Sequence, residues 1–285
     1  MSGIDVAAAD GPVTGTGGRR VRSVGLLIGV AIVGGYLLAA LLAPWISPHG
    51  PLELDVADAL AVPSAEHPLG TDDLGRDALS RLLHAARVDL ALGVAAGVTA
   101  YLLGTLVGLV SGYAGGWLDL VLTRVMDVVQ TMPVIVMIMI LLLVLGRGPV
   151  GIVVALALAS WVGYARLARG IVLAVRNLDH IAAARLAGLG HPRVLLRHVL
   201  PNVWTQGFVF LTSDIVLSVG AIAALGYLGI GIEASTPEWG QMISSGQAFL
   251  ATNWWLSLAP GLAIVVLGLG LALVSDALTD RLGSR

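Results

Sequence analysis

The stretch Trp254–Val274, WWLSLAPGLAIVVLGLGLALV, decides the fold class of this chain. It carries no charged side chain, and about 20 mostly apolar residues in a helix span the hydrocarbon core of a bilayer. Earlier segments of the same kind are Val24–Ala43, Leu90–Val110, Leu118–Leu145, Val150–Ala165 with a continuation to Val175, and Val203–Ile232. The sequence therefore predicts an all-α, polytopic membrane protein with six transmembrane helices.

The overall composition supports this class. The chain has 285 residues, of which 57% are hydrophobic and 12% charged, and its mean hydropathy is +0.90. Soluble domains carry roughly 25% charged residues, so this chain has too little polar surface to coat a water-soluble globule. Its 37 glycines suit closely packed membrane helices.

Two absent residue types exclude several chemistries. The chain has no Cys, which rules out disulfides and thiolate nucleophiles. It also has no Lys, because all 16 basic residues are Arg, and a nucleotide-binding P-loop needs its Lys. We therefore expect no enzyme activity, no cofactor and no metal site in this chain. The net charge of -2 gives no reason to expect nucleic acid as a partner.

The arginines predict how the chain crosses the membrane. With the N-terminus inside, four arginines fall outside, Arg76, Arg81, Arg87 and Arg147, and the other twelve fall inside. This bias favours both termini in the cytoplasm. We expect residues 1–23 to form a disordered cytoplasmic tail, 24–43 a retained first transmembrane helix rather than a signal peptide, 44–86 an extracytoplasmic segment, and 87–285 the transmembrane core. Within 44–86, Asp77–Arg87 is predicted as a short helix.

The cytoplasmic loop 176–201 is the most informative connection. A bare link between two spans needs only a few residues, but this loop holds a small-residue helix predicted over Ile181–Leu189 and three arginines, Arg185, Arg193 and Arg197. Small residues allow another surface to approach closely, which fits docking into a groove on a partner. The alternative is a basic loop that only sets topology or contacts anionic lipid.

Three motifs in order resemble a known family. The cytoplasmic loop contains Ala182-Ala183-Ala184-Arg185-Leu186-Ala187-Gly188 and ends at Leu200-Pro201, like the EAA loop of bacterial ABC-importer permeases. His67–Asp77, HPLGTDDLGRD, and Leu225–Gly231 followed by Thr236–Gly240 resemble motifs of the dipeptide, oligopeptide and nickel branch, in its second, C-type subunit. The chain departs from the family pattern in three places: Ala182 replaces the usual Glu of the EAA loop, the stretch Ile222-Ala223-Ala224 lacks a Glu that the family often carries, and Gly226 replaces a Ser.

The resemblance implies a fold, a function and partners. The implied fold is that of MetI-like, type I importer permeases in the bacterial plasma membrane. The implied function is a subunit that forms half of the pathway for di- or oligopeptides and couples to ATPases through the residues Ala182, Ala183, Ala184, Arg185, Gly188, Leu200 and Pro201. The implied partners are a homologous second permease subunit, two cytoplasmic ATPases that bind ATP and Mg²⁺, and an extracytoplasmic binding protein.

Polar residues inside the spans are candidates for the pathway. Asp214 lies about eleven residues into the fifth span, near the bilayer midplane. A carboxylate there is costly, so it should face a cavity or a partner. Gln206, Ser213, Asp214 and Ser218 share one side of the helix and form a polar stripe. The stripe could line a wet translocation path, or Asp214 could make a helix–helix hydrogen bond.

Several readings remain open at this point. Uptake of nickel or a metal chelate is the first alternative to peptide uptake, and a secondary transporter driven by protons through Asp214 is the second. None of the six histidines is spaced as a metal pair on a helix face within the membrane. Arg124 and Asp127, three residues apart, are expected to pair on one helix face.

Overall fold

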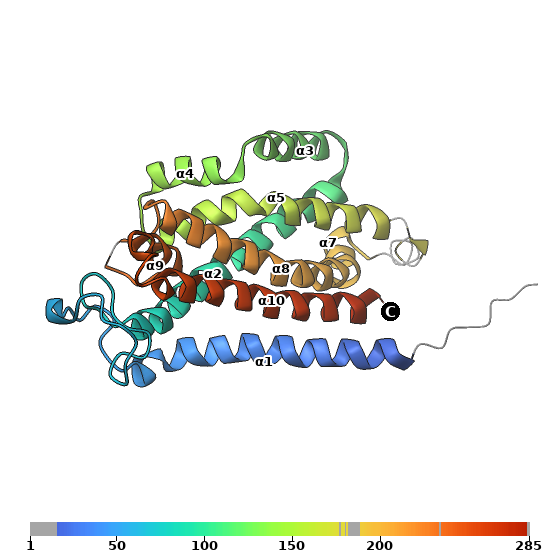
Figure 1. Ribbon diagram of the computed structural model, residues 1–285. Coiled ribbons are helices and arrows are strands. Elements are labelled where there is room, and N and C mark those ends of the chain that lie inside the picture. Colours follow the sequence, from blue (N-terminus) through green and yellow to red (C-terminus); the bar gives the residue numbers. More distant parts are fainter. Residues whose placement is uncertain (1–15, 177, 180, 182–188, 234, 284–285) are drawn as a thin grey trace, which may run out of the picture.

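The computed structural model describes residues 16–283 except 177, 180, 182–188 and 234. Five long helices dominate this part of the chain: α1 (Thr16–Ile46), α2 (Ala78–Ala114), α5 (Pro149–Val175), α8 (Leu200–Tyr227) and α10 (Trp255–Gly283) (Figure 1). Each is long and apolar enough to cross a membrane. The described residues therefore confirm an all-α, multi-spanning membrane protein.

The third predicted span is broken rather than continuous. It consists of α3 (Gly116–Thr131) and α4 (Val134–Leu145), which meet at 97°. Pro133 lacks the N–H that a continuing helix needs and disfavours helical backbone at the residue before it. Met132 is accordingly extended, with ψ of 136°. Counted as one span, this bent pair and the five long helices give the six predicted spans in the described residues, but the third span is not one continuous helix.

Other helix ends also differ from the sequence boundaries. α1 begins at Thr16, so residues 16–23 are helical and do not belong to a disordered tail; Arg is a good helix former, which lets the helix extend beyond the apolar run. Residues 1–15 lie outside the described part. The predicted short helix 77–87 and the second span are one helix, α2, which the Asp77 carboxylate caps. α8 ends at Tyr227, before Ile232.

A glycine stripe brings α2 against α5. Gly104, Gly108 and Gly112 lie on one side of α2 at four-residue intervals. A Cβ atom built on Gly108 would stand 2.7 Å from the Ala168 Cβ, and one built on Gly104 would overlap backbone of α5. Small residues at this spacing let two helix backbones approach closely in a membrane. This contact forms the centre of the bundle.

The other spans pack around this pair. α1 lies along α10, where the Tyr36 hydroxyl donates to the Ala263 carbonyl at 2.9 Å. α4 packs Ile138 and Leu142 against α5 and leaves Leu143 and Val144 exposed. Exposed aliphatic side chains on a helix of this kind are compatible with contact to lipid or to another apolar surface.

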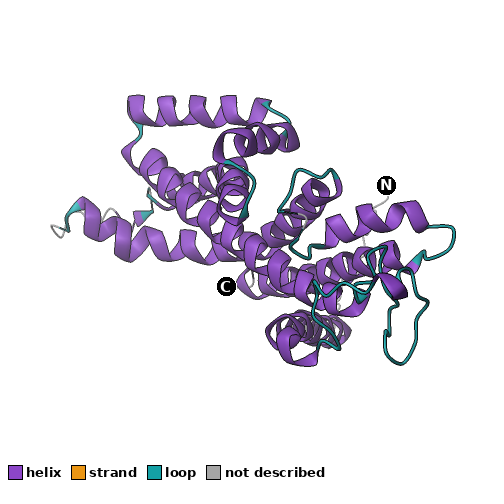
Figure 2. Cartoon of the chain, turned by 90° about the vertical axis from the view of Figure 1, so that its left-hand side faces the viewer, coloured by secondary structure: helices purple, strands orange, loops and turns teal. Residues whose placement is uncertain are grey.

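The two ends of the bundle are different. The segment 47–77, with the 3-10 turn η1 (Val56–Asp58), and the segment 228–254, with α9 (Trp239–Gly246) and η3 (Gln247–Phe249), gather at one end, which we call the loop end. Figure 2 views the molecule from this side, with the loops in teal. α7 (His191–Val194) and the π-helical turn η2 (Leu195–Val199) lie at the opposite end, which we call the α7 end.

Candidate functional site

A cavity opens between three of the spanning helices. It has a volume of about 470 Å³ and is lined by Leu167 of α5, by Gln206, Val209, Phe210 and Ser213 of α8, and by Ser275 and Thr279 of α10. The Ser213 and Ser275 hydroxyls lie 2.8 Å apart and form a hydrogen bond across the cavity wall. The wall therefore combines apolar surface with a few hydroxyl and amide groups.

The predicted polar stripe on α8 divides into two parts. Gln206 and Ser213 are exposed and line the cavity, whereas Asp214 and Ser218 are buried, at 5% and 4% exposure. The Asp214 Oδ2 atom accepts a hydrogen bond of 2.9 Å from the Tyr164 hydroxyl of α5. Asp214 thus makes the helix–helix hydrogen bond that the sequence left as an alternative.

An aromatic cluster surrounds this buried hydrogen bond. The Tyr164 ring packs against Phe210 at 4.8 Å and against Tyr101 at 5.6 Å between centroids. The Tyr101 hydroxyl in turn donates to the Trp204 carbonyl at 3.0 Å. Phe210 is also part of the cavity wall, so the cluster links α2, α5 and α8 directly to the cavity.

Ion pairs hold the helices together near the α7 end. Arg169 of α5 donates two hydrogen bonds to the Asp119 carboxylate of α3, at 2.6 and 2.7 Å, and Ser111 of α2 also donates to Asp119. Arg166 reaches Asp127 at 2.8 Å. The pairing of Arg124 with Asp127 is confirmed, at 3.6 Å.

Arg176 completes this arrangement where α5 ends. Its guanidinium donates to the Gly112 carbonyl near the end of α2 at 2.8 Å. In the sequence, Arg166, Arg169 and Arg176 indicate only the cytoplasmic side of the membrane, and their pairing was not predicted. Two features of the sequence could have indicated this pairing. The three arginines are spaced by three and seven residues, which places them on one helix face, and the neighbouring span carries two Asp residues eight positions apart.

Five of the seven predicted coupling residues in the loop 176–201 lie outside the described residues. Ala182, Ala183, Ala184, Arg185 and Gly188 all fall in 182–188. Of the remaining predicted loop residues, Leu200 and Pro201 open α8 rather than ending a loop, because the helical segment 191–199 runs directly into α8. Proline is well tolerated in a first helical turn, which reconciles Pro201 with this continuation.

At the loop end, the motif His67–Asp77 folds into a compact hydrogen-bonded loop at the start of α2. Asp72 accepts hydrogen bonds from the Leu74 and Arg76 backbone N–H groups and from the Arg76 side chain at 2.7 Å. Gly75 has φ of +73°, and a side chain there would overlap the Asp55 carbonyl. These contacts fix the motif as a structural element that ties segment 47–77 to α2.

The third motif, which includes Thr236–Gly240, lies at the same end and contacts α2. Glu238 is 2% exposed and caps α9 by accepting from the Gly240 and Gln241 N–H groups at 2.6 and 2.8 Å. The Trp239 indole donates to the Leu82 carbonyl of α2 at 3.2 Å. A side chain on Gly226 would overlap the Glu238 carboxylate. A residue larger than glycine at position 226 would therefore require the Glu238 side chain to move.

Comparison with known proteins identifies the class. Residues 104–285 match the family described as binding-protein-dependent transport system inner membrane components. The match covers more than half of the chain, and several full-length relatives extend it toward the N-terminus. The chain therefore belongs to this family, and it is a permease subunit of an ABC importer.

Individual relatives refine the comparison. A dipeptide transport system permease of Alkalihalophilus pseudofirmus is 34% identical over 90% of this chain and 84% of its own. A nickel transport system permease of Escherichia coli is 36% identical over 86% of this chain and 88% of its own. A chain of the MetNI methionine ABC transporter, in an inward-facing conformation, has a TM-score of 0.59 at 20% identity and covers 71% of this chain and 96% of its own. This likeness confirms the MetI-like fold.

Proposed function

We propose that this subunit forms half of the pathway through which a bacterial importer takes up di- and oligopeptides. The observation that carries the substrate class is the similarity to peptide permeases over 90% of the chain. The mixed wall of the 470 Å³ cavity supports it, because a peptide presents both apolar side chains and amide groups. The subunit pairs with a homologous permease, and a binding protein delivers the solute.

Uptake of nickel is the second candidate, since a nickel permease is equally similar to this chain. The two candidates separate in proteoliposomes that contain the complete transporter with its own binding protein. Labelled dipeptide should accumulate, and excess Ni²⁺ should leave its uptake unchanged. Accumulation of Ni²⁺ without accumulation of peptide would replace the first candidate by the second.

We infer that the loop around residues 182–188 docks onto the ATPase subunits, which bind ATP and Mg²⁺. Its position between α5 and α7 supports this, because the Arg169–Asp119 and Arg176–Gly112 contacts hold the adjoining helix ends in place. Force applied between these helix ends can pass to the spans. Ala182 in place of Glu removes a charged contact, but the small residues that permit close approach remain.

Replacing residues 179–192 by a flexible linker of equal length tests the docking directly. The variant should reach the membrane in normal amounts but should not bring down the ATPases on purification. Glu53→Gln, at the opposite end of the molecule, is the matched control and should retain them. Full ATPase recovery with the replaced loop would overturn the assignment.

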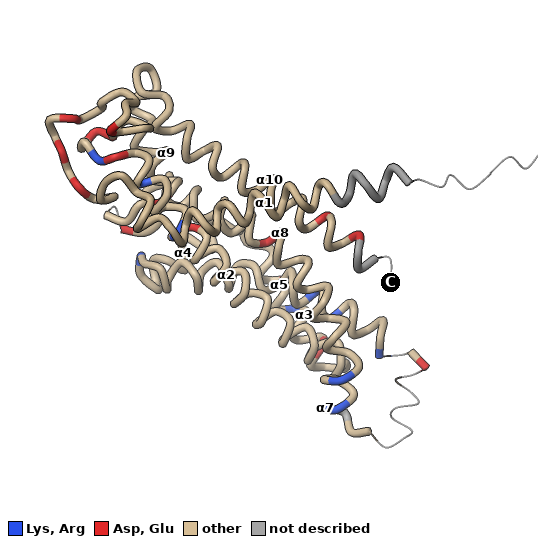
Figure 3. The backbone as a smooth tube through the Cα atoms, turned by 90° about the horizontal axis from the view of Figure 1, so that it is seen from below, with Lys and Arg blue, Asp and Glu red and all other residues tan. Residues whose placement is uncertain are grey.

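The distribution of charge supports an orientation with both termini in the cytoplasm. Figure 3 shows acidic residues gathered around the loop end and arginines near α7. Because arginines in short loops favour the cytoplasmic side, the α7 end faces the ATPases and the loop end faces the binding protein. Cysteines introduced singly at positions 53 and 193 should react with impermeant reagents from opposite sides of the membrane.

Gln206 and Ser213 are our candidates for the pathway wall. Ser213→Leu and Gln206→Leu should reduce uptake at least severalfold while the ATPases remain bound. Thr99→Val, which changes an exposed hydroxyl on α2 outside the cavity, is the control. Asp214 and Ser218 are buried behind this wall, and the hydrogen bond from Tyr164 to Asp214 holds α8 against α5. Unchanged uptake in both leucine variants would remove the cavity from the pathway.

A further inference from the structure

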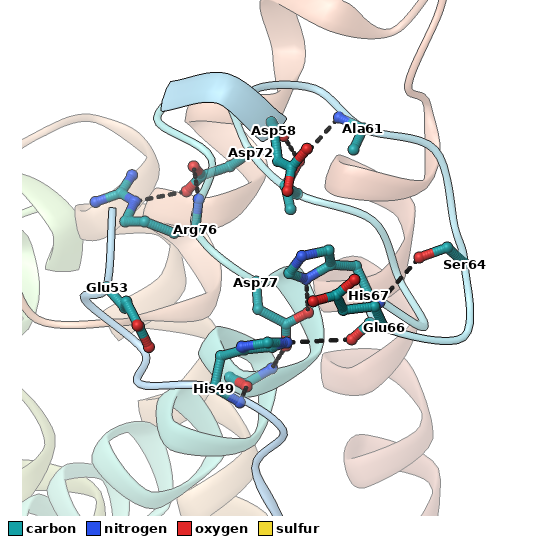
Figure 4. A network of polar contacts seen from close by, with 12 residues as sticks. His49, Glu53, Asp58, Ala61, Ser64, Glu66, His67, Asp72, Arg76 and Asp77 are labelled. Carbon is teal, nitrogen blue, oxygen red and sulfur yellow. Dashed lines mark hydrogen bonds and ion pairs between the residues drawn. The ribbon is translucent and has the colours of Figure 1, made fainter. Parts of the chain in front are cut away.

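Two histidines and a glutamate meet at the loop end although they do not share a helix face. His49, Glu66 and His67 each offer a ligand atom, and these atoms all lie within 4.8 Å of one another (Figure 4). Sequence spacing could not reveal this group, because His49 and Glu66 are 17 positions apart in a segment without a long helix. The fold of segment 47–77 brings them together.

His67 is held in the orientation that a metal ligand needs. Its Nδ1 atom lies 3.0 Å from the Asp77 Oδ1 atom, and the Asp77 side chain is fully buried. The other carboxylate oxygen, Oδ2, accepts from the Ser80 N–H at 2.7 Å and so fixes Asp77 to the first turn of α2. A carboxylate that binds one ring nitrogen orients the imidazole and leaves the Nε2 atom as the ligand.

His49 is placed by the same turn of α2. Its backbone N–H donates to the Ser80 hydroxyl at 3.2 Å, and its ring stacks on His67 with centroids 4.6 Å apart. Its Nε2 atom lies 3.2 Å from the Glu66 carbonyl oxygen. The Glu66 carboxylate is exposed, and one of its oxygen atoms lies within 4.8 Å of a ring nitrogen of each histidine. The two histidines of the group are thus held by contacts to the start of α2.

We propose that His49, Glu66 and His67 bind a divalent transition-metal ion of the Zn²⁺ type, with a fourth position for water. Two imidazoles and one carboxylate are a ligand set for Zn²⁺ and its neighbours in the first transition series, whereas Ca²⁺ and Mg²⁺ prefer oxygen ligands throughout. The ion joins residue 49 to residues 66–67 and closes the intervening loop. It is resident in the loop end and is independent of the transported solute.

The test uses the full-length protein in detergent, without a polyhistidine tag, after removal of metal by EDTA and dialysis. Competition with a chromogenic chelator should show one equivalent of bound Zn²⁺. His49→Gln and Glu66→Gln should each weaken this binding by roughly tenfold or more. His84→Gln is the matched control, because His84 also contacts Ser80 but lies outside the group, and it should keep the wild-type affinity.

A spectroscopic measurement separates loss of the site from loss of folding. Co²⁺ bound at the site should give visible absorption bands of nitrogen and oxygen coordination, and His49→Gln should abolish them while the circular dichroism and gel-filtration profile stay unchanged. His67→Gln is less informative, because it also removes the partner of Asp77. Absence of stoichiometric binding by the wild type, or equal affinity in the His49 and Glu66 variants, would overturn the proposal.

Discussion

A single buried carboxyl group connects the stability of the loop end to pH. Glu238 lies outside the spanning helices, and its burial raises its pKa from an ordinary value of 4.5 to about 7, against the opposing effect of the hydrogen bonds from Gly240 and Gln241. Between pH 4.5 and pH 7, the Glu238 carboxyl group is protonated in the folded protein but ionised in the unfolded chain. The contribution of Glu238 to stability is therefore full below pH 4.5 and is lost as the pH rises through 7.

The loss of stability with rising pH can be measured against the variant Glu238→Gln, which cannot ionise at this position. The free energy of unfolding of the wild type, relative to this variant, should fall by about 3 kcal/mol between pH 4.5 and pH 8, since one pKa unit corresponds to about 1.4 kcal/mol. Equilibrium unfolding in mixed micelles across this range measures the difference. A relative stability that rises with pH would contradict the burial of a protonated carboxyl.

The Arg169–Asp119 pair is a second feature at the residue scale. Its two hydrogen bonds and its partly buried side chains predict a coupling free energy of about 0.5–3 kcal/mol in a double-mutant cycle for unfolding. Arg124–Asp127, with an arginine side chain that is 75% exposed, should give a smaller coupling of about 0–1 kcal/mol. Equal coupling in the two cycles would show that Arg169 does not hold α3 to α5.

At the scale of elements, the contact of α2 with α5 depends on the absence of side chains. Gly108→Leu should destabilise the protein by about 1–3 kcal/mol or separate the two helices, because the new side chain has no room beside Ala165 and Ala168. Gly170→Ala on α5 is the control, since a Cβ there meets nothing within 4 Å. Thermal unfolding in detergent should distinguish the two; an equally small shift in both would contradict close packing.

The helices show what a pattern of apolar residues can predict and where it fails. Long apolar runs located the spans, because burial in lipid is a property of composition that the sequence carries directly. The bend between α3 and α4 was missed although Pro133 is visible in the sequence. Proline is often tolerated in membrane helices, so the residue alone does not distinguish a kink from a break of 97°.

The same limit applies to the candidate site. The position of Asp214 in its span indicated a buried partner or a cavity, but only the packing of α8 on α5 selects Tyr164 as that partner. The sequence treated the stripe as one surface, whereas the structure turns Gln206 and Ser213 toward the cavity and Asp214 away from it. Contacts between residues far apart in the chain, such as His49 with His67, depend on the fold. The periodicity of the sequence could not predict them.

At the scale of the whole molecule, a bundle of long helices connects the loop end to the α7 end. The loop end is held by hydrogen bonds to the carboxylates of Asp72, Asp77 and Glu238, and the α7 end by arginine contacts between α2, α3 and α5. The cavity of the candidate pathway lies between α5, α8 and α10 of this bundle.

The central claim is that this subunit moves solute only when separate ATPases drive it. The most direct measurement is uptake of labelled dipeptide into proteoliposomes that contain both permease subunits and the binding protein, with and without the ATPase subunits. We predict accumulation that requires the ATPases and hydrolysable ATP and does not respond to an imposed pH gradient. Accumulation at the full rate without ATPases, or driven by the pH gradient alone, would contradict this account.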